Sequence, residues 1–116
     1  MRTIFKTLCL LSLSFMLQSA WAADPEAGEA KFKQLCATCH GDAGKGDGPA
    51  AAGLDPKPRD MSDTEWQESV DDEHLRTVIT EGEPAVGLSS TMTAFGHALD
   101  DDDLDNVIAY IRSLDD

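Results

Sequence analysis

The sequence contains little positive charge, few aromatic rings and only three cysteines. Lysine and arginine together number 9 against 22 aspartate and glutamate residues, so the 116-residue chain has a formal net charge of −13. A surface with this excess of negative charge repels nucleic acids and anionic lipids, and we therefore expect neither as a partner. A basic docking patch on another protein is a better match, although acidity that serves only solubility would give the same composition.

Long hydrophobic runs are missing except near the amino terminus. Two basic residues precede an apolar segment at 8–17, and a small-x-small cleavage pattern ends at Ala22. These are the parts of a secretory signal peptide, and the apolar run is shorter than the roughly 20 residues that a membrane-spanning helix needs. We predict that residues 1–22 are removed and that residues 23–116 form one domain in the periplasm without stable membrane insertion. Removal of the leader, which has two basic and no acidic residues, would change the net charge from −13 to −15.

Cysteine is so scarce that only Cys36 and Cys39 remain after the predicted cleavage. In an exported protein two cysteines suggest a disulfide by default. A bridge across two intervening residues closes a very small loop, however, and contributes little to stability. The pair therefore needs another explanation, and His40 directly follows it.

Helical patterns separated by two long loops run through the mature chain, and no alternating pattern of strands is present. Asp24 and Pro25 are typical of a helix start, which predicts a helix over 25–38 that runs into the cysteine motif. Ser62 or Asp63 can cap a short helix that ends at about residue 70.

The two later helices have clearer apolar faces. Asp71 or Asp72 can cap a helix that ends at Gly82 and has an inner stripe of Leu75, Val78 and Ile79. The last helix begins after Asp100, and its apolar positions repeat at i, i+3, i+4 and i+7: Leu104, Val107, Ile108 and Ile111. Glycine, proline and hydroxyl residues predict loops over 41–60 and 82–98, so the expected fold class is all-α.

The stretch Cys36-Ala-Thr-Cys39-His40 is the attachment signature of a c-type haem. Residues three and four apart share one face of a helix, so Cys36 can lie near both Cys39 and His40. The thiols can then form thioethers with the two vinyl groups, and the imidazole can reach the iron. Zinc sites and iron–sulfur clusters usually need four protein ligands, and no second pair exists here. We predict one haem c, held covalently through Cys36 and Cys39.

Several further residues follow the order of a known family. They are Gly28 and Phe32 at four-residue steps before Cys36, Gly48-Pro49 after the motif, Met92 before the last helix, and Val107-Ile108-Ala109-Tyr110-Ile111 within it. With them the mature chain resembles the class I cytochromes c of the small bacterial type. The resemblance implies a small cytochrome c fold in which the amino- and carboxyl-terminal helices cross, with Gly28 and Phe32 against Val107 and Tyr110. It also implies that the ring N–H of His40 donates to the Pro49 carbonyl.

The second axial ligand of the iron has several candidates. The resemblance implies Met92, because the family places its ligand in a loop just before the last helix. Met61, an imidazole from His74 or His97, and an open position remain as alternatives. The family often has proline after this methionine, whereas Thr93 stands here, which puts the rigidity of the loop in question.

Other parts of the haem site are predicted more loosely. Arg59 and Trp66 are possible donors to the two propionates, although Arg59 can equally be a solvated loop residue and Trp66 a core residue. The polar surroundings of His74 and His97 favour the surface for both rings. The expected walls of the pocket are Leu54, Leu75, Ile79, Leu88 and Phe95.

These features predict a soluble electron carrier rather than an enzyme, with His40 and Met92 as iron ligands. No nucleophile–base pair stands out elsewhere in the chain, and electron transfer requires none. The alternatives are a haem enzyme or gas sensor with an open sixth site, and a tightly bound cytochrome subunit of a larger redox enzyme.

Overall fold

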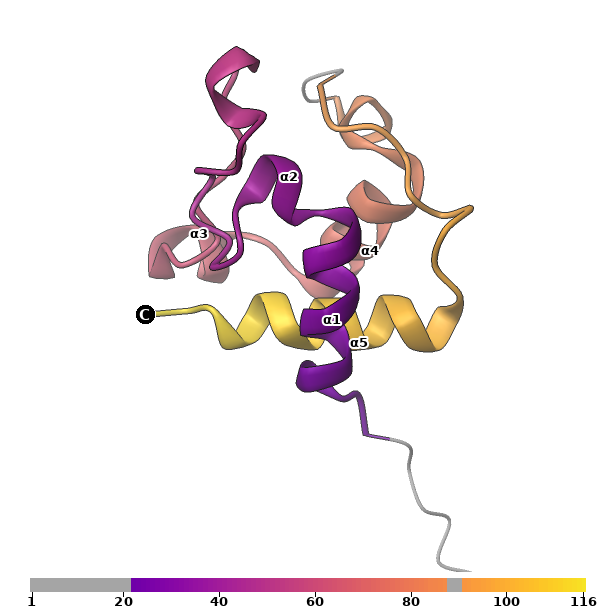
Figure 1. Cartoon of the computed structure of the whole chain (residues 1–116). Helices are drawn as coiled ribbons and strands as arrows, with labels where there is room; N and C mark the ends of the chain where they lie inside the picture. The colour runs from indigo at the N-terminus through magenta and orange to yellow at the C-terminus, as the bar shows by residue number, and fades with distance from the viewer. Residues whose placement is uncertain (1–21, 88–90) are drawn as a thin grey trace, which may run out of the picture.

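The computed structural model describes residues 22–87 and 91–116, and these ranges contain helices and loops but no strand. Figure 1 shows the helices gathered around the crossing of α1 and α5, with the loops extending to one side of it. The elements in chain order are α1 (Pro25–Leu35), α2 (Ala37–His40), the 3-10 helix η1 (Ala51–Gly53), α3 (Thr64–Ser69), α4 (Asp72–Glu81), the 3-10 helix η2 (Glu83–Val86) and α5 (Asp101–Ser113). The expected all-α fold is confirmed.

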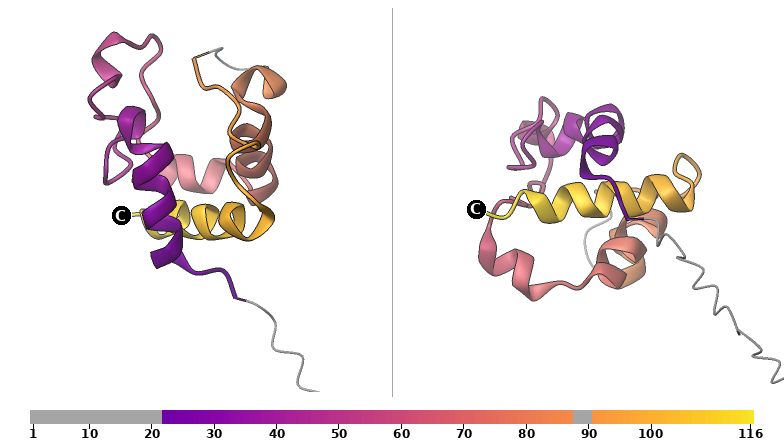
Figure 2. Two further views of the ribbon diagram at one scale, coloured as in Figure 1. Left: turned by 45° about the vertical axis from the view of Figure 1, so that its right-hand side comes forward. Right: turned by 90° about the horizontal axis from the view of Figure 1, so that it is seen from below.

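The crossing of α1 over α5 is the most extensive contact between helices and is visible from each side in Figure 2. Gly28 lies directly against the last helix, because a Cβ atom at this position would overlap the Asn106 carbonyl and approach the Val107 nitrogen to 2.9 Å. One turn later the Phe32 ring packs edge-on against Tyr110, with ring centroids 5.1 Å apart. Phe32 and Val107 are fully buried. The predicted contacts of the two terminal helices are therefore confirmed.

Aspartate side chains begin four of the five α-helices. Asp24 caps α1, Asp63 caps α3 and Asp71 caps α4, each by accepting hydrogen bonds from backbone N–H groups of the first turn. At the start of α5 the Asp103 N–H donates to Asp100 Oδ1 at 2.7 Å, and the Asp103 carboxylate accepts from the Asp100 N–H. These caps satisfy donors that have no partner inside a helix, so part of the acidity of this chain serves its secondary structure.

The first helix is shorter than the sequence predicts. It ends at Leu35, and Cys36 has φ −115° and ψ −31°, which interrupts the helical path before α2 begins. The prediction of one continuous helix over 25–38 is therefore wrong. The break turns α2 away from α1 (Figure 1), so the cysteine motif is presented by a separate short helix.

Arg112 attaches the middle of the chain to α5. Its guanidinium donates to the backbone carbonyls of Gln67 and Val70, at 2.7 and 2.6 Å, and to the Asp72 carboxylate at 2.8 Å. The buried Gln67 side chain adds bonds from Nε2 to the carbonyls of Met61 and Ile111. Together these bonds fix α3 and the start of α4 to α5, while Trp66 and Val70 pack against the core.

The predicted leader, 1–22, lies outside the described residues except for Ala22, and so does the predicted pocket residue Leu88. Across 22–87 and 91–116, no helix is both long enough and apolar enough to cross a bilayer.

The close approach at Gly28 generates a stability prediction. Gly28→Ala should lower the free energy of unfolding by about 1–3 kcal/mol, because the added methyl group must push α1 away from the α5 backbone. Helix propensity alone predicts the opposite sign, a gain of about 0.5–1 kcal/mol from replacing a helical glycine. Denaturant unfolding of the purified protein, followed by circular dichroism, measures the difference.

Gly53→Ala is the matched control, because a Cβ at Gly53 would meet no atom within 4 Å. It should change stability by no more than about 0.5 kcal/mol. Equal effects of the two substitutions would show that the helix crossing does not depend on glycine.

Candidate haem-binding site

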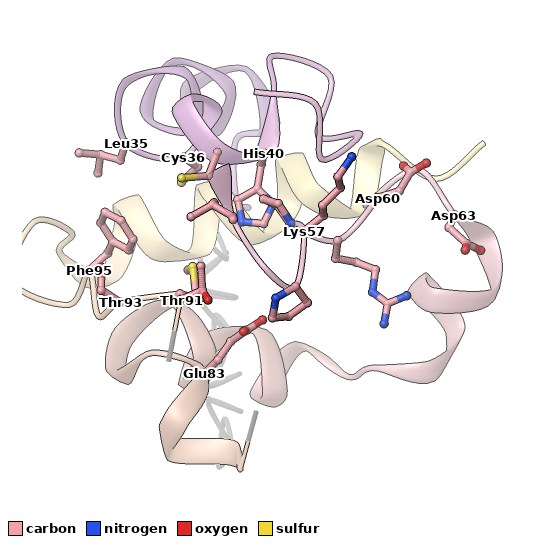
Figure 3. Close-up of a pocket in the computed structure, with 16 residues that line it drawn as sticks. Leu35, Cys36, His40, Lys57, Asp60, Asp63, Glu83, Thr91, Thr93 and Phe95 are labelled. Carbon is pink, nitrogen blue, oxygen red and sulfur yellow. The ribbon is translucent and has the colours of Figure 1, made fainter. Parts of the chain in front are cut away.

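A cavity of about 390 Å³ lies between α2 with its following loop on one side and the segment after α4 on the other. Figure 3 shows Cys36 and His40 on one wall and Glu83 and Thr91 on the opposite wall. Both cysteines, His40 and Met92 line this cavity, so the structure brings all four predicted site residues to one place.

The two cysteines are held on one short turn. The backbone N–H groups of Cys39 and His40 both donate to the Cys36 carbonyl, at 3.2 and 2.9 Å. Both thiols are free rather than joined in a disulfide. Burial, and to a lesser extent the neighbouring Cys39, raises the pKa of the Cys36 thiol to about 11. The pair therefore presents two partly buried thiols to the cavity, which is the arrangement that two thioether bonds to one flat group require.

His40 is a mostly buried imidazole whose Nδ1 has no hydrogen-bond partner in the described part of the chain. Burial lowers the pKa of this ring, with a smaller opposite effect from the Arg59 backbone, and so favours the neutral form that binds metals. The predicted bond from His40 to the Pro49 carbonyl is not present. A buried nitrogen without a partner costs about 1–3 kcal/mol, so the protein alone leaves this site incomplete.

The loop after His40 is tied back onto α2. The N–H groups of Gly46, Gly48 and Ala50 donate to the carbonyls of His40, Cys39 and Thr38, at 2.8, 3.2 and 2.9 Å. A Cβ atom at Gly48 would overlap the Ala37 and Thr38 carbonyls, so only glycine allows this approach. The loop thereby forms a fixed wall behind the histidine.

The segment that carries Met92 is fastened to η2 at the methionine itself and to α4 three residues later. The Met92 carbonyl accepts from the Glu83 N–H at 3.2 Å, and the Phe95 N–H donates to the Ile79 carbonyl at 2.8 Å. Gly82 permits this approach, because a Cβ there would meet the Met92 carbonyl at 3.0 Å and its φ of +85° favours glycine. Backbone bonds thus position the loop in which Thr93 replaces the family's proline.

A second, inner cavity of about 110 Å³ continues from the first and shares four of its lining residues: His40, Arg59, Glu83 and Met92. Its other walls include Met61 and Trp66 together with His74 from α4. The prediction of a surface position is therefore wrong for His74, which is half-buried, whereas His97 is exposed and lines neither cavity. Polar neighbours in sequence did not reveal that α4 turns His74 inward.

Four of the five apolar residues that the sequence predicted for the pocket line one of the two cavities. Leu54 and Phe95 line the outer cavity, while Leu75 and Ile79 line the inner one. The sequence did not suggest Glu83, whose carboxyl group has its pKa raised by burial against the opposing effects of Arg59 and His74. The only signal for Glu83 was its position directly after the helix stop at Gly82.

A haem fits the residues present. The two thiols, the neutral imidazole with an unpartnered ring nitrogen and the thioether of Met92 all border one continuous space. Mostly apolar walls close its sides, and Arg59 and Trp66 provide polar hydrogens at its inner end. A haem held here supplies reversible one-electron chemistry at its iron.

Comparison with known proteins supports this assignment. Residues 23–111 match the family model described as cytochrome c oxidase, cbb3-type, subunit III. The solved structure described as KustC0563 c-type cytochrome is similar with a TM-score of 0.64 and 27% identity, over 77% of this chain and 98% of that one. A chain of the Kuenenia stuttgartiensis reducing HAO-like protein complex Kustc0457/Kustc0458 has a TM-score of 0.62 and 26% identity. That match covers 78% of this chain but 42% of the other. No curated protein sequence matches the chain.

The fold and the cavity are those of a small c-type cytochrome, a class of haem electron-transfer proteins. The chain belongs to the family of c-type cytochrome domains described by the cbb3-type subunit III model, which matches most of the predicted mature chain.

The geometry of the two thiols predicts how haem is attached. Cys36→Ala and Cys39→Ala should each leave one thioether, which shifts the α band of the pyridine haemochrome to longer wavelength because one vinyl group stays conjugated. The double variant should lose all haem to acidified acetone. Cys9→Ala, which lies in the predicted leader, is the control and should behave like the wild type. Covalent haem in the double variant would contradict the assignment.

Proposed function

We propose that this chain is an exported, periplasmic electron carrier that moves single electrons between redox proteins with one covalently held haem c. Cys36 and Cys39 attach the haem, and His40 and Met92 ligate its iron. The observation that carries the proposal is the convergence of these four side chains on one cavity from two separate parts of the chain: the turn from Cys36 to His40 and the loop before α5.

Met92 is favoured over the other candidates for the sixth ligand. It borders both cavities, as His40 does, and its loop is fastened to α4 by backbone hydrogen bonds. Met61 borders only the inner cavity and is buried in the core with 8% of its surface exposed. His97 is exposed and lines neither cavity, so its ring would have to move before it could bind the iron. Methionine with histidine raises the reduction potential, which suits a carrier that accepts electrons easily.

Arg59 and Trp66 are proposed to face the haem propionates. Both line the inner cavity, and the structure shows no hydrogen bond from either side chain in 22–87 or 91–116. Two buried carboxylates need such donors, because burying an unpaired charge is costly. In this arrangement Arg59 and Trp66 would hold the propionates at the inner cavity, and Cys36 and Cys39 would hold the opposite edge of the haem at the outer one.

The rim of the outer cavity is proposed as the contact for redox partners. Its apolar part is formed by Leu35 and Phe95, which lie together at one side of the opening in Figure 3. Lys57, Asp60 and Asp63 lie on the charged side, so the rim itself carries both signs. The large excess of acidic residues elsewhere attracts a basic partner over distance, while the apolar rim makes the close contact.

A role as a bound subunit is the second candidate, because the matching family is named for an oxidase subunit and one similar structure is part of a redox complex. The size of the assembly that contains this chain in a native extract distinguishes a free carrier from a subunit.

The axial pair predicts specific spectra. The oxidised wild-type protein should show the weak far-red band of methionine-ligated ferric haem, and Met92→Ala should abolish it and allow the reduced protein to bind carbon monoxide. Met61→Ala is the control and should keep the band. A wild type that lacks the band and binds carbon monoxide readily would replace the carrier by an enzyme or a sensor with an open sixth site.

The acidic surface predicts how charged reagents react with the haem. Oxidation of the reduced protein by a cationic cobalt complex should slow as salt is added, because screening removes an attraction. Oxidation by ferricyanide should accelerate, because screening removes a repulsion. Stopped-flow absorbance measures both rates. Rates that ignore salt for both reagents would show that surface charge does not steer encounters at this rim.

A further inference from the structure

The carboxyl-terminal end of α4 is bonded to the segment 92–96, which carries the candidate sixth ligand. Helix ends leave carbonyl groups that have no partner inside the helix. In α4 the Ile79 carbonyl accepts from the Phe95 N–H at 2.8 Å, and the Thr80 carbonyl accepts from the Gly96 N–H at 3.2 Å. The segment therefore completes the hydrogen bonding of the helix end, and the helix end in turn fixes the segment.

Two glycines make this contact close, one on each side of it. Gly82 directly follows α4, and a Cβ atom there would lie 3.0 Å from the Met92 carbonyl oxygen and 3.2 Å from the Ala94 nitrogen. Gly96 ends the segment, and a Cβ atom there would lie 2.9 Å from both the methyl group and the carbonyl oxygen of Thr80. A side chain at either position would push the segment away from α4.

The candidate ligand itself takes part in the contact. The Met92 carbonyl oxygen is the atom nearest to a Cβ at Gly82, and it also accepts from the Glu83 N–H at 3.2 Å. The Met92 side chain borders both cavities, as His40 does. A shift of the segment on α4 therefore moves the backbone of the ligand residue and not only that of a neighbour.

The two glycines differ in backbone conformation, which separates contact from strain. Gly82 has φ +85° and ψ 164°, a region that is essentially restricted to glycine. The backbone at Gly96 does not lie in the left-handed region. A substitution at Gly96 therefore changes the contact with α4 alone, whereas one at Gly82 changes the contact and also strains the backbone.

We propose that Gly82 and Gly96 are positioning residues for the sixth iron ligand, which act by setting how closely the Met92 segment lies on α4. The inference rests on the proposed function, in which Met92 ligates the haem iron. Imidazole suits iron, whereas a thioether is a softer ligand. The thioether therefore competes with an external imidazole through its high local concentration at the site. A segment fastened to a helix end keeps this concentration high, and a loosened segment lowers it.

The experiment titrates imidazole into the oxidised holoprotein and follows the loss of the far-red band of methionine-ligated haem. Gly96→Ala and Gly82→Ala should each bind imidazole about tenfold more tightly than the wild type, because overpacking displaces a closely fitted contact. Amide hydrogen exchange is the second readout, and the Phe95 N–H should exchange faster in both variants. Both should retain covalent haem.

Gly87→Ala is the matched control. Gly87 has a positive φ of +76° and follows η2 as Gly82 precedes it, but a Cβ there would meet no atom within 4 Å. This variant should bind imidazole within about twofold of the wild type. Met92→Ala sets the upper limit of the affinity, because no thioether competes in it. If strain at Gly82 prevents folding, Gly96→Ala decides the question alone, since its backbone lies outside that region.

Three outcomes would overturn the proposal. A Gly96→Ala protein that loses thermal stability but binds imidazole within about twofold of the wild type would show that the glycine serves only the fold. Equal effects of Gly87→Ala and Gly82→Ala would assign the change to backbone strain around η2. In both cases tighter binding by Met92→Ala would leave the proposed function intact. A Met92→Ala protein that binds imidazole like the wild type would instead remove Met92 as the ligand, and the proposed function with it.

Discussion

The contact between the backbones of α1 and α5 at Gly28 is the constraint on which the rest of the structure depends. It allows Phe32, one turn later, to pack against Tyr110 and to lie beside the His40 ring, with ring centroids 6.3 Å apart. The helix crossing thus supports the His40 ring through Phe32, in addition to the loop that is bonded back onto α2. A small domain has few other buried side chains, so a loss of this contact would reach the cavity directly.

The loops on the two sides of the cavity are fixed by a different means. Each is bonded through backbone groups to the end of a helix: the loop after His40 to α2, and the Met92 segment to α4. Glycine at positions 48 and 82 permits these approaches, because a side chain there would meet carbonyl oxygens. Long loops are therefore compatible with a defined site, since hydrogen bonds to helix ends add to the few apolar contacts of these loops, such as that of Phe95 with the core.

Most of the helices could be predicted from the sequence, because an aspartate cap and an apolar stripe are features of neighbouring residues. The sequence pattern predicted the Asp71 cap, the stop at Gly82 and the buried face of α5 for this reason. It missed the break at Cys36, where the helical preference of the flanking residues continues and only the tertiary arrangement turns the chain. It also missed the inward position of His74 and the part of Glu83 in the cavity wall, since both depend on which segments α4 and η2 face across the inner cavity. The motif predicted His40 as a haem ligand, whereas the polar residues that border the two cavities became visible only in the fold.

The distribution of charge separates two properties of this cytochrome. Most of its acidic residues are exposed, and salt and water screen them, so their main effect is on encounters with other proteins. The half-buried Glu83 and His74 border the inner cavity together with His40 and Met92, and screening is weaker there than at the exposed surface. We therefore expect surface substitutions to act mainly on encounters with partners, and substitutions in the inner cavity to act mainly on the reduction potential. Composition therefore suggests the charge of a partner but not the redox properties of the site, because it does not show which charged residues the fold places beside the cavity.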